Sequence, residues 1–404
     1  MPSSAFRIFA FMEAVFRGPS PTAVRRPAGT GTIVEMLDAA GLRALQPEWE
    51  ALAADAAEAN PFYEHWTLLP ALQAFGEGDG FRCAAVWQDG TLGALFPMQL
   101  QQRFHGMPLR TLRSWSHRNM LHCTPLIRGK GGSQNAVKCV TALLQSGLAA
   151  VYDFDWTCTD GYFYGALVES VLAQGMPWMV TDAYMRPALV RGRDPRERFN
   201  SNTRNNLRRN ETRLRTHGEL TPVRLAAGDD LQKWTDEFIR LEASGWKGRA
   251  GTAIGCRADD QRFFAEVLPE AFRRERLVIT GLDLAGKPLA RHLMLSGGEG
   301  CFSIKLAYDE AHEKSSPGML AEVDNVRQFM ENPGPRWIDS NTARESQGYG
   351  RVWKDCRTVQ RIAVGASGIG RLAVTALPFM RLAKHFVRGL RAERSGTGDA
   401  RQPA

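Results

Sequence analysis

Apolar and polar residues alternate along several short stretches of the chain, and a period of two predicts β-strands. In the first half such stretches lie at residues 32–37, 81–87, 92–100, 109–115, 124–127, 153–156 and 178–183. Apolar residues spaced three or four apart predict helices at residues 42–57, after Asn60-Pro61, at 135–148 and at 163–174. The first half is therefore expected to begin with one strand and two helices and to continue with a hairpin.

The second half repeats this order of elements. A strand is predicted at residues 220–226, and then two helices at 229–243 and 260–274. A hairpin at 277–284 and 288–296 precedes a strand at 301–308, a helix from Pro317 to Met330, and strands at 336–340 and 358–364. The hairpin turns Asp89-Gly90 and Ala285-Gly286 fall at matching places. We infer an internal duplication of an α+β unit of about 160 residues.

An arginine-rich helix is predicted to link the two units. Asp194 as N-cap, Pro195 in the first turn and Glu197 three residues after the cap predict a helix that runs to about His217. It carries seven arginines, at positions 196, 198, 204, 208, 209, 213 and 215. Such a helix either recognises an anionic partner, such as RNA, a nucleotide or a lipid-linked phosphate, or is an ordinary solvated helix. Phe199 is its one aromatic residue, which gives little support for base stacking.

Composition is typical of a globular protein, with 404 residues and a net charge of +8. The seven cysteines are scattered and form no zinc-binding spacing, so we expect a reducing compartment and no metal. No apolar run approaches the roughly 20 residues that cross a bilayer, and a cytoplasmic location is expected. Arg7 and Glu13 interrupt the apolar residues at the start, so residues 1–31 are interpreted as a mobile leader.

The C-terminal tail, residues 367–404, mixes apolar and basic residues. Its large apolar residues are Leu372, Leu377, Phe379, Leu382, Phe386 and Leu390. They are interleaved with arginine and lysine, a pattern that fits an interfacial helix on an anionic membrane face, with a kink at Pro378. The residues after Arg394 are expected to be disordered.

A glycine-rich turn after the helix at 229–243 combines several chemically useful side chains. Glycine lets the backbone take positive φ and approach a ligand closely. The candidate contacts to a substrate in and beside this turn are Ser244, Trp246, Lys247, Gly251 and Thr252. The alternative is a capped helix and an ordinary loop, with Trp246 filling the core.

Three motifs resemble the tandem-domain branch of the GNAT acyltransferase superfamily, the FemAB-like and CelD-like proteins. They are Glu242 to Ala253 (EASGWKGRAGTA), Ser315 to Leu320 (SSPGML), and Ile338-Asp339-Ser340 with Arg351-Val352-Trp353-Lys354. The resemblance covers about residues 33–365 and is most specific in the second half. It implies a tandem duplication of a GNAT-like α+β fold, with mixed, mainly antiparallel sheets flanked by helices. The expected divisions are 1–31, 32–190, 191–218, 219–366 with the donor site, and 367–404.

The resemblance also implies the donor and its site. Family donors include acyl-CoA and, in the FemAB relatives, aminoacyl-tRNA; no tightly bound cofactor is expected, and acyl-CoA would be a co-substrate. Unpaired N–H groups at a helix start bind phosphate, and the predicted donor site comprises Ser315, Ser316, Pro317, Gly318, Met319 and Leu320. The usual pyrophosphate loop of glutamine or arginine with spaced glycines is absent, and residues 315–318 hold its place.

Acyl transfer to an amine requires a group that accepts a proton. The candidate bases are Glu242, His292 and Asp309. A lone histidine in a strand is more often structural than catalytic, and Asp309 is equally consistent with a turn residue. Lys305, Arg351 and Lys354 join the substrate contacts. His117 and His122 are assigned no role beyond acceptor contacts, while Cys256 and Cys301 are interpreted as small apolar fillers.

The predicted function is an N-acyltransferase that moves an acyl group from a thioester, most simply acyl-CoA, to an amine on a sugar, lipid-linked or cell-envelope precursor. One alternative changes the donor to aminoacyl-tRNA, with the arginine helix as the RNA contact, although tRNA is the less favoured partner. Another is a non-catalytic accessory protein of envelope or polysaccharide synthesis. A peripheral position at the inner membrane face, through the tail, is compatible with each.

Overall fold

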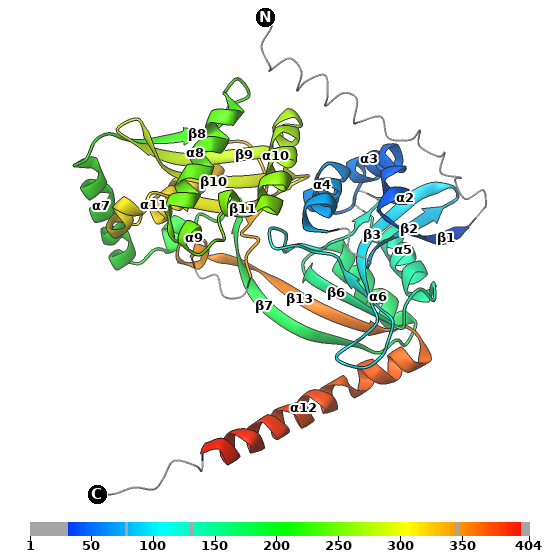
Figure 1. The fold of residues 1–404 in the computed structure, drawn as a ribbon. Helices are drawn as coiled ribbons and strands as arrows, with labels where there is room; N and C mark the ends of the chain where they lie inside the picture. The colour runs from blue at the N-terminus through cyan, green and yellow to red at the C-terminus, as the bar shows by residue number, and fades with distance from the viewer. Residues whose placement is uncertain (1–30, 77–79, 130–131, 344–347, 397–404) are drawn as a thin grey trace, which may run out of the picture.

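The computed structural model describes residues 31–76, 80–129, 132–343 and 348–396, and within them the strands join into one continuous sheet (Figure 1). The strand order is β1-β2-β3-β4-β6-β13-β7-β12-β11-β10-β9-β8, and β5 pairs with β3 at the side of this path. The strand bounds are β1 Thr32–Leu37, β2 Phe81–Gln88, β3 Thr91–Gln101, β4 Thr111–Ser114, β5 Leu126–Ile127, β6 Val151–Cys158, β7 Trp178–Val190, β8 Leu220–Arg224, β9 Leu277–Leu284, β10 Lys287–Gly297, β11 Gly300–Tyr308, β12 Trp337–Asp339 and β13 Asp355–Gly365.

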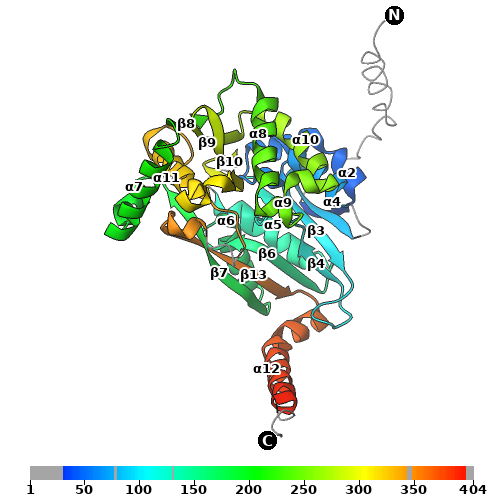
Figure 2. The ribbon, with the colours of Figure 1, turned by 60° about the vertical axis from the view of Figure 1, so that its left-hand side comes forward.

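Helices flank both faces of this sheet (Figures 1 and 2). The α-helices are α2 Ala39–Arg43, α3 Gln46–Ala54, α4 His65–Phe75, α5 Ser133–Gln145, α6 Tyr162–Ala173, α7 Ser201–Arg215, α8 Leu231–Ser244, α9 Trp246–Arg249, α10 Ala258–Arg273, α11 Pro317–Glu331 and α12 Gly368–Gly396. Short 3-10 helices are η1 Pro61–Tyr63, η2 Pro195–Arg198, η3 Ile254–Cys256, η4 Glu310–Ser315 and η5 Tyr349–Arg351. None of the described helices is long and apolar enough to cross a bilayer.

The two halves repeat one topology, as the sequence predicts. In each half four antiparallel strands, β1 to β4 or β8 to β11, are followed by a parallel pair. This pair is β4 with β6 in the first half and β11 with β12 in the second. In each half a helix, α5 or α11, lies in the connection between those parallel strands. The α+β fold class with a mixed, mainly antiparallel sheet flanked by helices is confirmed.

One hydrophobic core joins the two halves. Helices α2, α3 and α4 of the first half pack with α8 and α10 of the second, and the rings of Phe75 and Phe263 lie 5.2 Å apart between α4 and α10. On the other face of the sheet, α5 and α6 cover the first half. The second half is covered there by α11, whose Val326 and Phe329 pack with Ile338 and Trp353.

The last strand lies elsewhere than the sequence predicts. Residues 358–364 are expected in the second unit, but β13 pairs with β6 and β7 and so completes the first half of the sheet. Strand β7 is also longer than the predicted 178–183, and its end pairs with β12 through Ala188, Leu189 and Val190. The sheet therefore runs across the expected divisions 32–190 and 219–366. The sequence did not predict this, because pairing between strands that are far apart in the chain leaves no local pattern.

Two predicted helices are interrupted. The helix expected at 42–57 is divided into α2 and α3, with Leu45 between them. The helix expected from Pro195 to His217 consists of η2 and α7, and the break falls at Phe199 and Asn200. Asn200 has an extended backbone and its side chain accepts a hydrogen bond from the N–H of Thr203, so it starts a new helix. The leader at residues 1–30 and the end of the tail at 397–404 lie outside the described residues.

Candidate active site

His292 of β10 lies in a buried polar cluster in the second half. Its Nδ1 atom is 2.8 Å from Oε1 of Glu322 on α11, and its Nε2 atom is 2.8 Å from the hydroxyl of Ser303 on β11. The hydroxyl of Tyr349 is 3.2 Å from the same Nε2 atom and 2.7 Å from the hydroxyl of Ser303. Nε2 of His292 and the hydroxyls of Ser303 and Tyr349 are therefore hydrogen-bonded to one another, and Glu322 lies at ion-pair distance on the other side of the imidazole ring.

A second layer of contacts holds this cluster in place. The indole N–H of Trp353 donates to Oε2 of Glu322 at 3.0 Å, and the amide of Asn325 lies 3.4 Å from Nδ1 of His292. Burial raises the pKa of Tyr349, and the nearby Glu322 raises it further. Tyr349 therefore keeps its proton near neutral pH and can act as a donor.

The sequence pointed to His292 alone among these residues. Ser303, Glu322, Asn325 and Tyr349 were missed, since they come from separate segments that only the tertiary fold brings together. One signal was present on α11, where the polar Glu322 and Asn325 stand three residues apart and so share a helix face.

Strand β11 contains an irregularity next to this cluster. In its pairing with β10, Leu293 faces Lys305 and Met294 faces Ser303, so Ile304 is an extra residue. A bulge of this kind leaves the extra residue out of the ladder and redirects its neighbours. The pairing of β11 with β12 ends at Phe302 and Asp339, one residue before Ser303. The bulge therefore lies where the two parallel strands part, a position that favours a ligand at the open end of a sheet.

The predicted donor segment forms the turn between η4 and α11, beyond the end of β11. Ser316 has the left-handed conformation with φ 49°, and Pro317 occupies the first turn of α11. Gly318 lies against the ring of Tyr308, and a Cβ atom there would be 2.8 Å from that ring. Ser315, Pro317, Gly318 and Leu320 are buried, whereas Ser316 and Met319 remain partly exposed. Whether this helix start binds a donor stays a prediction.

Glu242 has two lysine partners and a structural contact. Its Oε1 atom lies 3.1 Å from Nζ of Lys305 and 3.4 Å from Nζ of Lys247, and its Oε2 atom accepts the N–H of Ile254 at 2.8 Å. Its side chain is fully buried. These contacts fix the path of the glycine-rich turn, so His292 has the better geometry for proton transfer, and the role of Glu242 as a base stays a prediction.

The glycine-rich turn presents part of its surface to solvent. Trp246 is 54% exposed, which excludes the interpretation that its ring fills the core. Gly251 has φ 66°, in agreement with the positive φ that glycine permits. Lys247 donates to the carbonyl of Leu306 at 2.8 Å, and burial lowers its pKa. Ser244 and Thr252 bond to backbone carbonyls of the turn and of α8.

The remaining predicted residues lie at the edges of this region. The Asp309 carboxylate accepts the N–H of Ala311 at 2.9 Å and caps η4, as expected for a turn residue. Arg351 is exposed. Lys354 donates to the carbonyl of Arg351 at 2.8 Å, and its Nζ lies 5.8 Å from the ring centroid of Phe199. Neither side chain belongs to the His292 cluster.

The histidines of the first half contribute to packing between the halves. The ring of His117 stacks on Phe75 at 4.4 Å and contacts Phe263, and burial lowers its pKa to about 3. His122 lies 4.8 Å from the ring of Phe302, and burial also lowers its pKa. Both rings lie inside the junction of the halves. Cys301 is buried as an apolar filler in the core under α11, while Cys256 is exposed, contrary to that interpretation.

The arginine helix α7 lies beside the predicted donor segment. Arg213 donates to the carbonyl of Lys314 at 3.0 Å, and the rings of His217 and His312 are 5.4 Å apart. Leu214 is its buried anchor. Five arginines of α7 are exposed, Arg204, Arg208, Arg209, Arg213 and Arg215.

Residues 201–349, which contain the whole His292 cluster except Trp353, match the family profile described as an acetyltransferase (GNAT) domain. The chain carries a GNAT acetyltransferase domain. The resemblance inferred from its motifs and the class of enzyme, an acyltransferase, are thereby confirmed. A search of curated proteins finds no match.

Several solved structures are similar to this GNAT protein over most of its length. FemX is 11% identical, with a TM-score of 0.48, over 80% of this chain and 96% of FemX. The C-terminal domain of a putative lysylphosphatidylglycerol synthetase from Agrobacterium fabrum is 11% identical, with a TM-score of 0.46, over 82% and 94%. A tandem GNAT protein from the clavulanic acid biosynthesis pathway is 11% identical, with a TM-score of 0.39, over 83% and 99%. At these identities and TM-scores none of the three decides the donor or the acceptor.

Proposed function

We propose that this protein is an N-acyltransferase that transfers an acyl group from a thioester, most simply acyl-CoA, to an amine on a sugar, lipid-linked or cell-envelope precursor. The observation that carries the proposal is the bulge at Ile304, which lies where β11 parts from β12 and directly beside Ser303 of the His292 cluster. Acyl transfer needs a hydrogen-bond donor that stabilises the oxyanion and a route that carries a proton. The bulge would supply the first and the His292 cluster the second, and the two are adjacent.

The donor carbonyl would bind at the bulge. In the reaction the amine nitrogen attacks the thioester carbon, and negative charge develops on the carbonyl oxygen before the C–S bond breaks. A backbone N–H that the ladder does not use is suited to stabilise this charge. The phosphates of the donor would then extend toward the start of α11 at Ser316 to Leu320. There the N–H groups of Ser316, Met319 and Leu320 already donate to backbone carbonyls, so the N–H of Gly318 and the helix dipole would attract the anion.

The His292 cluster would move the proton. The amine loses one proton and the leaving thiolate gains one, so a chain that passes a proton serves both steps. Tyr349 holds its proton and can donate it to the thiolate sulfur, while Ser303 connects it to His292. Glu322, 2.8 Å from Nδ1 of His292, would stabilise the imidazolium when His292 takes up a proton.

The acceptor would bind at the glycine-rich turn. Trp246 offers an exposed flat ring, which suits a sugar face or an apolar part of the acceptor. Lys247 and Lys305 stand beside Glu242 with partly exposed side chains, and they would contact a phosphate or carboxylate of the acceptor. Ser244, Gly251 and Thr252 would complete this contact.

One observation favours an alternative donor. The five exposed arginines of α7 lie next to η4 and the start of α11, and such a surface fits the phosphates of a tRNA. An aminoacyl-tRNA would keep the same chemistry with an ester in place of the thioester. A non-catalytic role in envelope or polysaccharide assembly is the remaining alternative, and it predicts no turnover of either donor.

A thermal-shift screen against CoA, acetyl-CoA and longer acyl-CoAs tests the donor. A ligand at 100 times its Kd that binds only the folded state adds about 2.7 kcal/mol to stability. We expect an upward shift that Ser316→Asp abolishes, because a carboxylate repels phosphate, whereas Ser201→Asp at the start of α7 leaves it unchanged.

The absence of a shift with every thioester would contradict the proposal for acyl-CoA. Binding of tRNA that weakens steeply with salt, and that is lost when Arg208 and Arg209 are changed to glutamine, would then support the alternative donor. Release of no product from either donor, in a protein that folds normally, would leave the non-catalytic role.

A further inference from the structure

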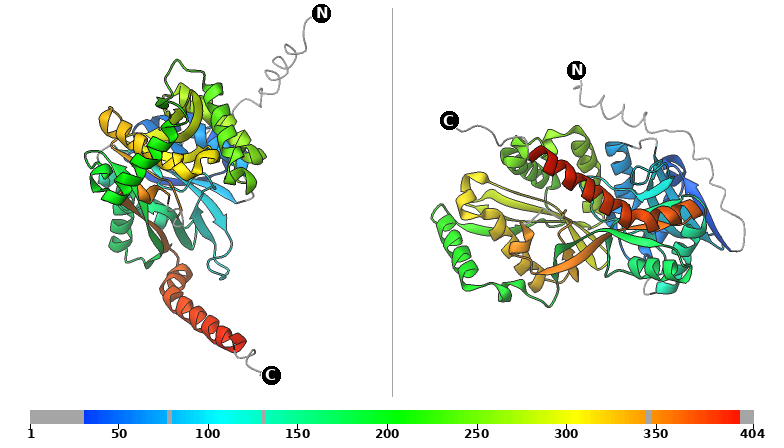
Figure 3. Two further views of the ribbon diagram at one scale, coloured as in Figure 1. Left: turned by 90° about the vertical axis from the view of Figure 1, so that its left-hand side faces the viewer. Right: turned by 90° about the horizontal axis from the view of Figure 1, so that it is seen from below.

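Helix α12 extends away from the rest of the molecule along most of its length (Figures 1 and 3). Only its first turns pack on the body, where Ala373, Val374 and Leu377 are buried against Phe104 and Leu109. Gly370 allows this close approach, since a Cβ atom there would lie 1.8 Å from the carbonyl oxygen of Ala150. The first turns of α12, which we call its anchored part, therefore bury one apolar face against the first half of the protein.

The anchored part of α12 carries a second apolar face that no described residue covers. Ile369, Leu372, Phe379 and Met380 follow one another at helical spacing, and their exposed fractions are 62%, 71%, 72% and 37%. A surface helix with one packed face normally presents polar residues on the opposite one. Further along the helix the sequence continues the same spacing with Phe386, Val387 and Leu390. We call Ile369, Leu372, Phe379 and Met380 the apolar stripe of α12.

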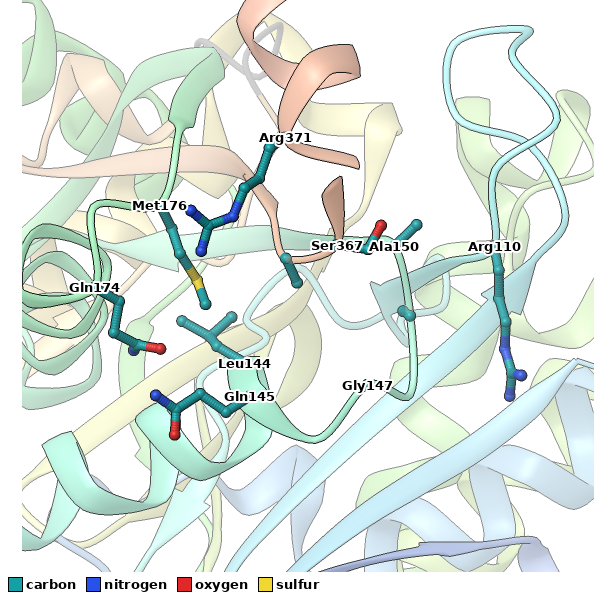
Figure 4. A pocket seen from close by; sticks show the side chains of 11 residues that line it. Arg110, Leu144, Gln145, Gly147, Ala150, Gln174, Met176, Ser367 and Arg371 are labelled. Carbon is teal, nitrogen blue, oxygen red and sulfur yellow. The ribbon is translucent and has the colours of Figure 1, made fainter. Parts of the chain in front are cut away.

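The charge of this region selects the kind of surface that the stripe contacts. Residues 367–396 include six basic residues, Arg371, Arg381, Lys384, Arg388, Arg391 and Arg394, against the single acidic residue Glu393. At the base of α12 a hollow of about 500 Å³ is lined by Arg110 and Arg371 and by no carboxylate. The two arginines come from opposite sides of this hollow (Figure 4). Apolar residues beside many cations and few anions complement a lipid surface with anionic headgroups.

We propose that α12 is an interfacial membrane anchor that lies on an anionic bilayer. Ile369, Leu372, Phe379 and Met380 insert among the acyl chains, while the basic residues of the helix contact the headgroup phosphates. Because the first turns of α12 pack on the first half of the protein, a helix that lies on the bilayer holds the rest of the protein at the bilayer surface. This inference does not depend on which donor or acceptor the GNAT domain uses.

Co-sedimentation of the full chain with vesicles tests the proposal. Phosphatidylcholine vesicles are compared with vesicles that also contain phosphatidylglycerol. We expect binding to the mixed vesicles that decreases as salt is added, because salt screens the headgroup charge. The double variant Leu372→Asp/Phe379→Asp should bind at least roughly tenfold more weakly, since each inserted apolar side chain contributes a factor of about ten or more.

A matched double variant separates this effect from general surface changes. Leu172 and Met185 are 66% and 61% exposed outside α12, and Leu172→Asp/Met185→Asp should bind vesicles as the unchanged protein does. Circular dichroism and melting of both double variants should match the parent, because all four positions are exposed.

Four outcomes would overturn the proposal. They are equal vesicle binding by the α12 variant and the parent, no preference for phosphatidylglycerol, and loss of binding on removal of residues 1–30 alone. The fourth is a dimer, seen in sedimentation velocity, that the α12 substitutions dissociate, which would mean that a second copy covers the stripe.

Discussion

The imidazole of His292 and the carboxylate of Glu322 form a pair at 2.8 Å in which neither side chain is more than 4% exposed. The pair joins strand β10 to helix α11 and leaves Nε2 of His292 facing the hydroxyls of Ser303 and Tyr349. A buried carboxylate in this position orients the imidazole ring. In this arrangement Glu322 orients the imidazole ring of His292. The residues that would exchange a proton with the substrate, Ser303 and Tyr349, lie on the opposite side of the ring, at Nε2.

Replacing Glu322 by glutamine should slow turnover and leave donor binding intact. The substitution keeps the shape of the side chain and removes the charge that stabilises the imidazolium, so kcat should fall by roughly 10²-fold or more. Free thiol released from the acyl-CoA identified in the thermal-shift screen measures this change. Asp324→Asn is the matched control, because Asp324 lies on the same helix and its carboxylate bonds to Arg327 and Gln328. Equal loss in both variants would contradict a specific role of Glu322.

Tyr349→Phe should separate proton donation from packing. The phenylalanine ring keeps the contact with Trp353, whose ring centroid is 4.7 Å from that of Tyr349, and removes only the hydroxyl. We expect kcat to fall by about 10²-fold with an unchanged melting temperature in the presence of donor. Tyr308→Phe provides the control on β11, since its ring packs on Gly318. A fully active Tyr349→Phe would assign the proton of the leaving group to another residue.

Local pattern predicted the hairpins, and it failed where segments far apart in the chain meet. Alternate residues of β9 and β10 pack in different cores, Ile279 and Leu293 in one and Val278 and Met294 in another, and the two strands flank the turn Ala285-Gly286. The hairpin could therefore be recognised from the sequence alone. The chain of Glu322, His292, Ser303 and Tyr349 depends on a helix, two strands and a late 3-10 turn, and no periodicity relates them. His292 was identified by residue type, while its partners required the fold.

The stability of the protein should decrease as the pH falls from about 6.5 toward 3, and His117 should account for part of this change. Burial lowers the pKa of His117 to about 3 in the folded protein, against about 6.5 in the unfolded chain. Below pH 6.5 the unfolded chain therefore binds a proton that the folded protein excludes. The contribution is complete above pH 6.5 and is lost at up to about 1.4 kcal/mol per pH unit below it.

Urea unfolding of His117→Phe as a function of pH measures this contribution. Phenylalanine retains a ring to stack on Phe75 and cannot be protonated, so the slope between pH 6.5 and 3 should become shallower than in the parent. Burial also lowers the pKa of His122, which remains in the variant and keeps part of the slope. His217→Phe, at an exposed position, should leave the slope unchanged. A parallel pH profile for His117→Phe and the parent would show that His117 is protonated in the folded state.

Strand β13 should be required for the first half to fold, although nearly the whole second half separates them in sequence. It forms hydrogen-bonded ladders with both β6 and β7, and its Ile362, Ala363 and Val364 are completely buried. Arg361 also pairs with the buried Asp153 of β6. Each large apolar residue of this kind contributes about 1.5–3 kcal/mol, which is a large share of the roughly 5–15 kcal/mol that stabilises a domain. Loss of β13 would in addition leave β6 and β7 without a partner on the side where β13 lies, so that β6 pairs only with β4 and β7 only with β12 among the described strands.

A chain that ends at residue 354 should therefore lack a cooperative melting transition, whereas a chain that ends at residue 378 should keep one. The longer chain retains β13 and the three buried residues of α12, Ala373, Val374 and Leu377, so its first half stays covered. Circular dichroism on heating compares the two chains. A cooperative transition of the shorter chain at the temperature of the longer one would mean that β6 and β7 pair with each other once β13 is gone, and that the two halves fold within the divisions expected from the sequence.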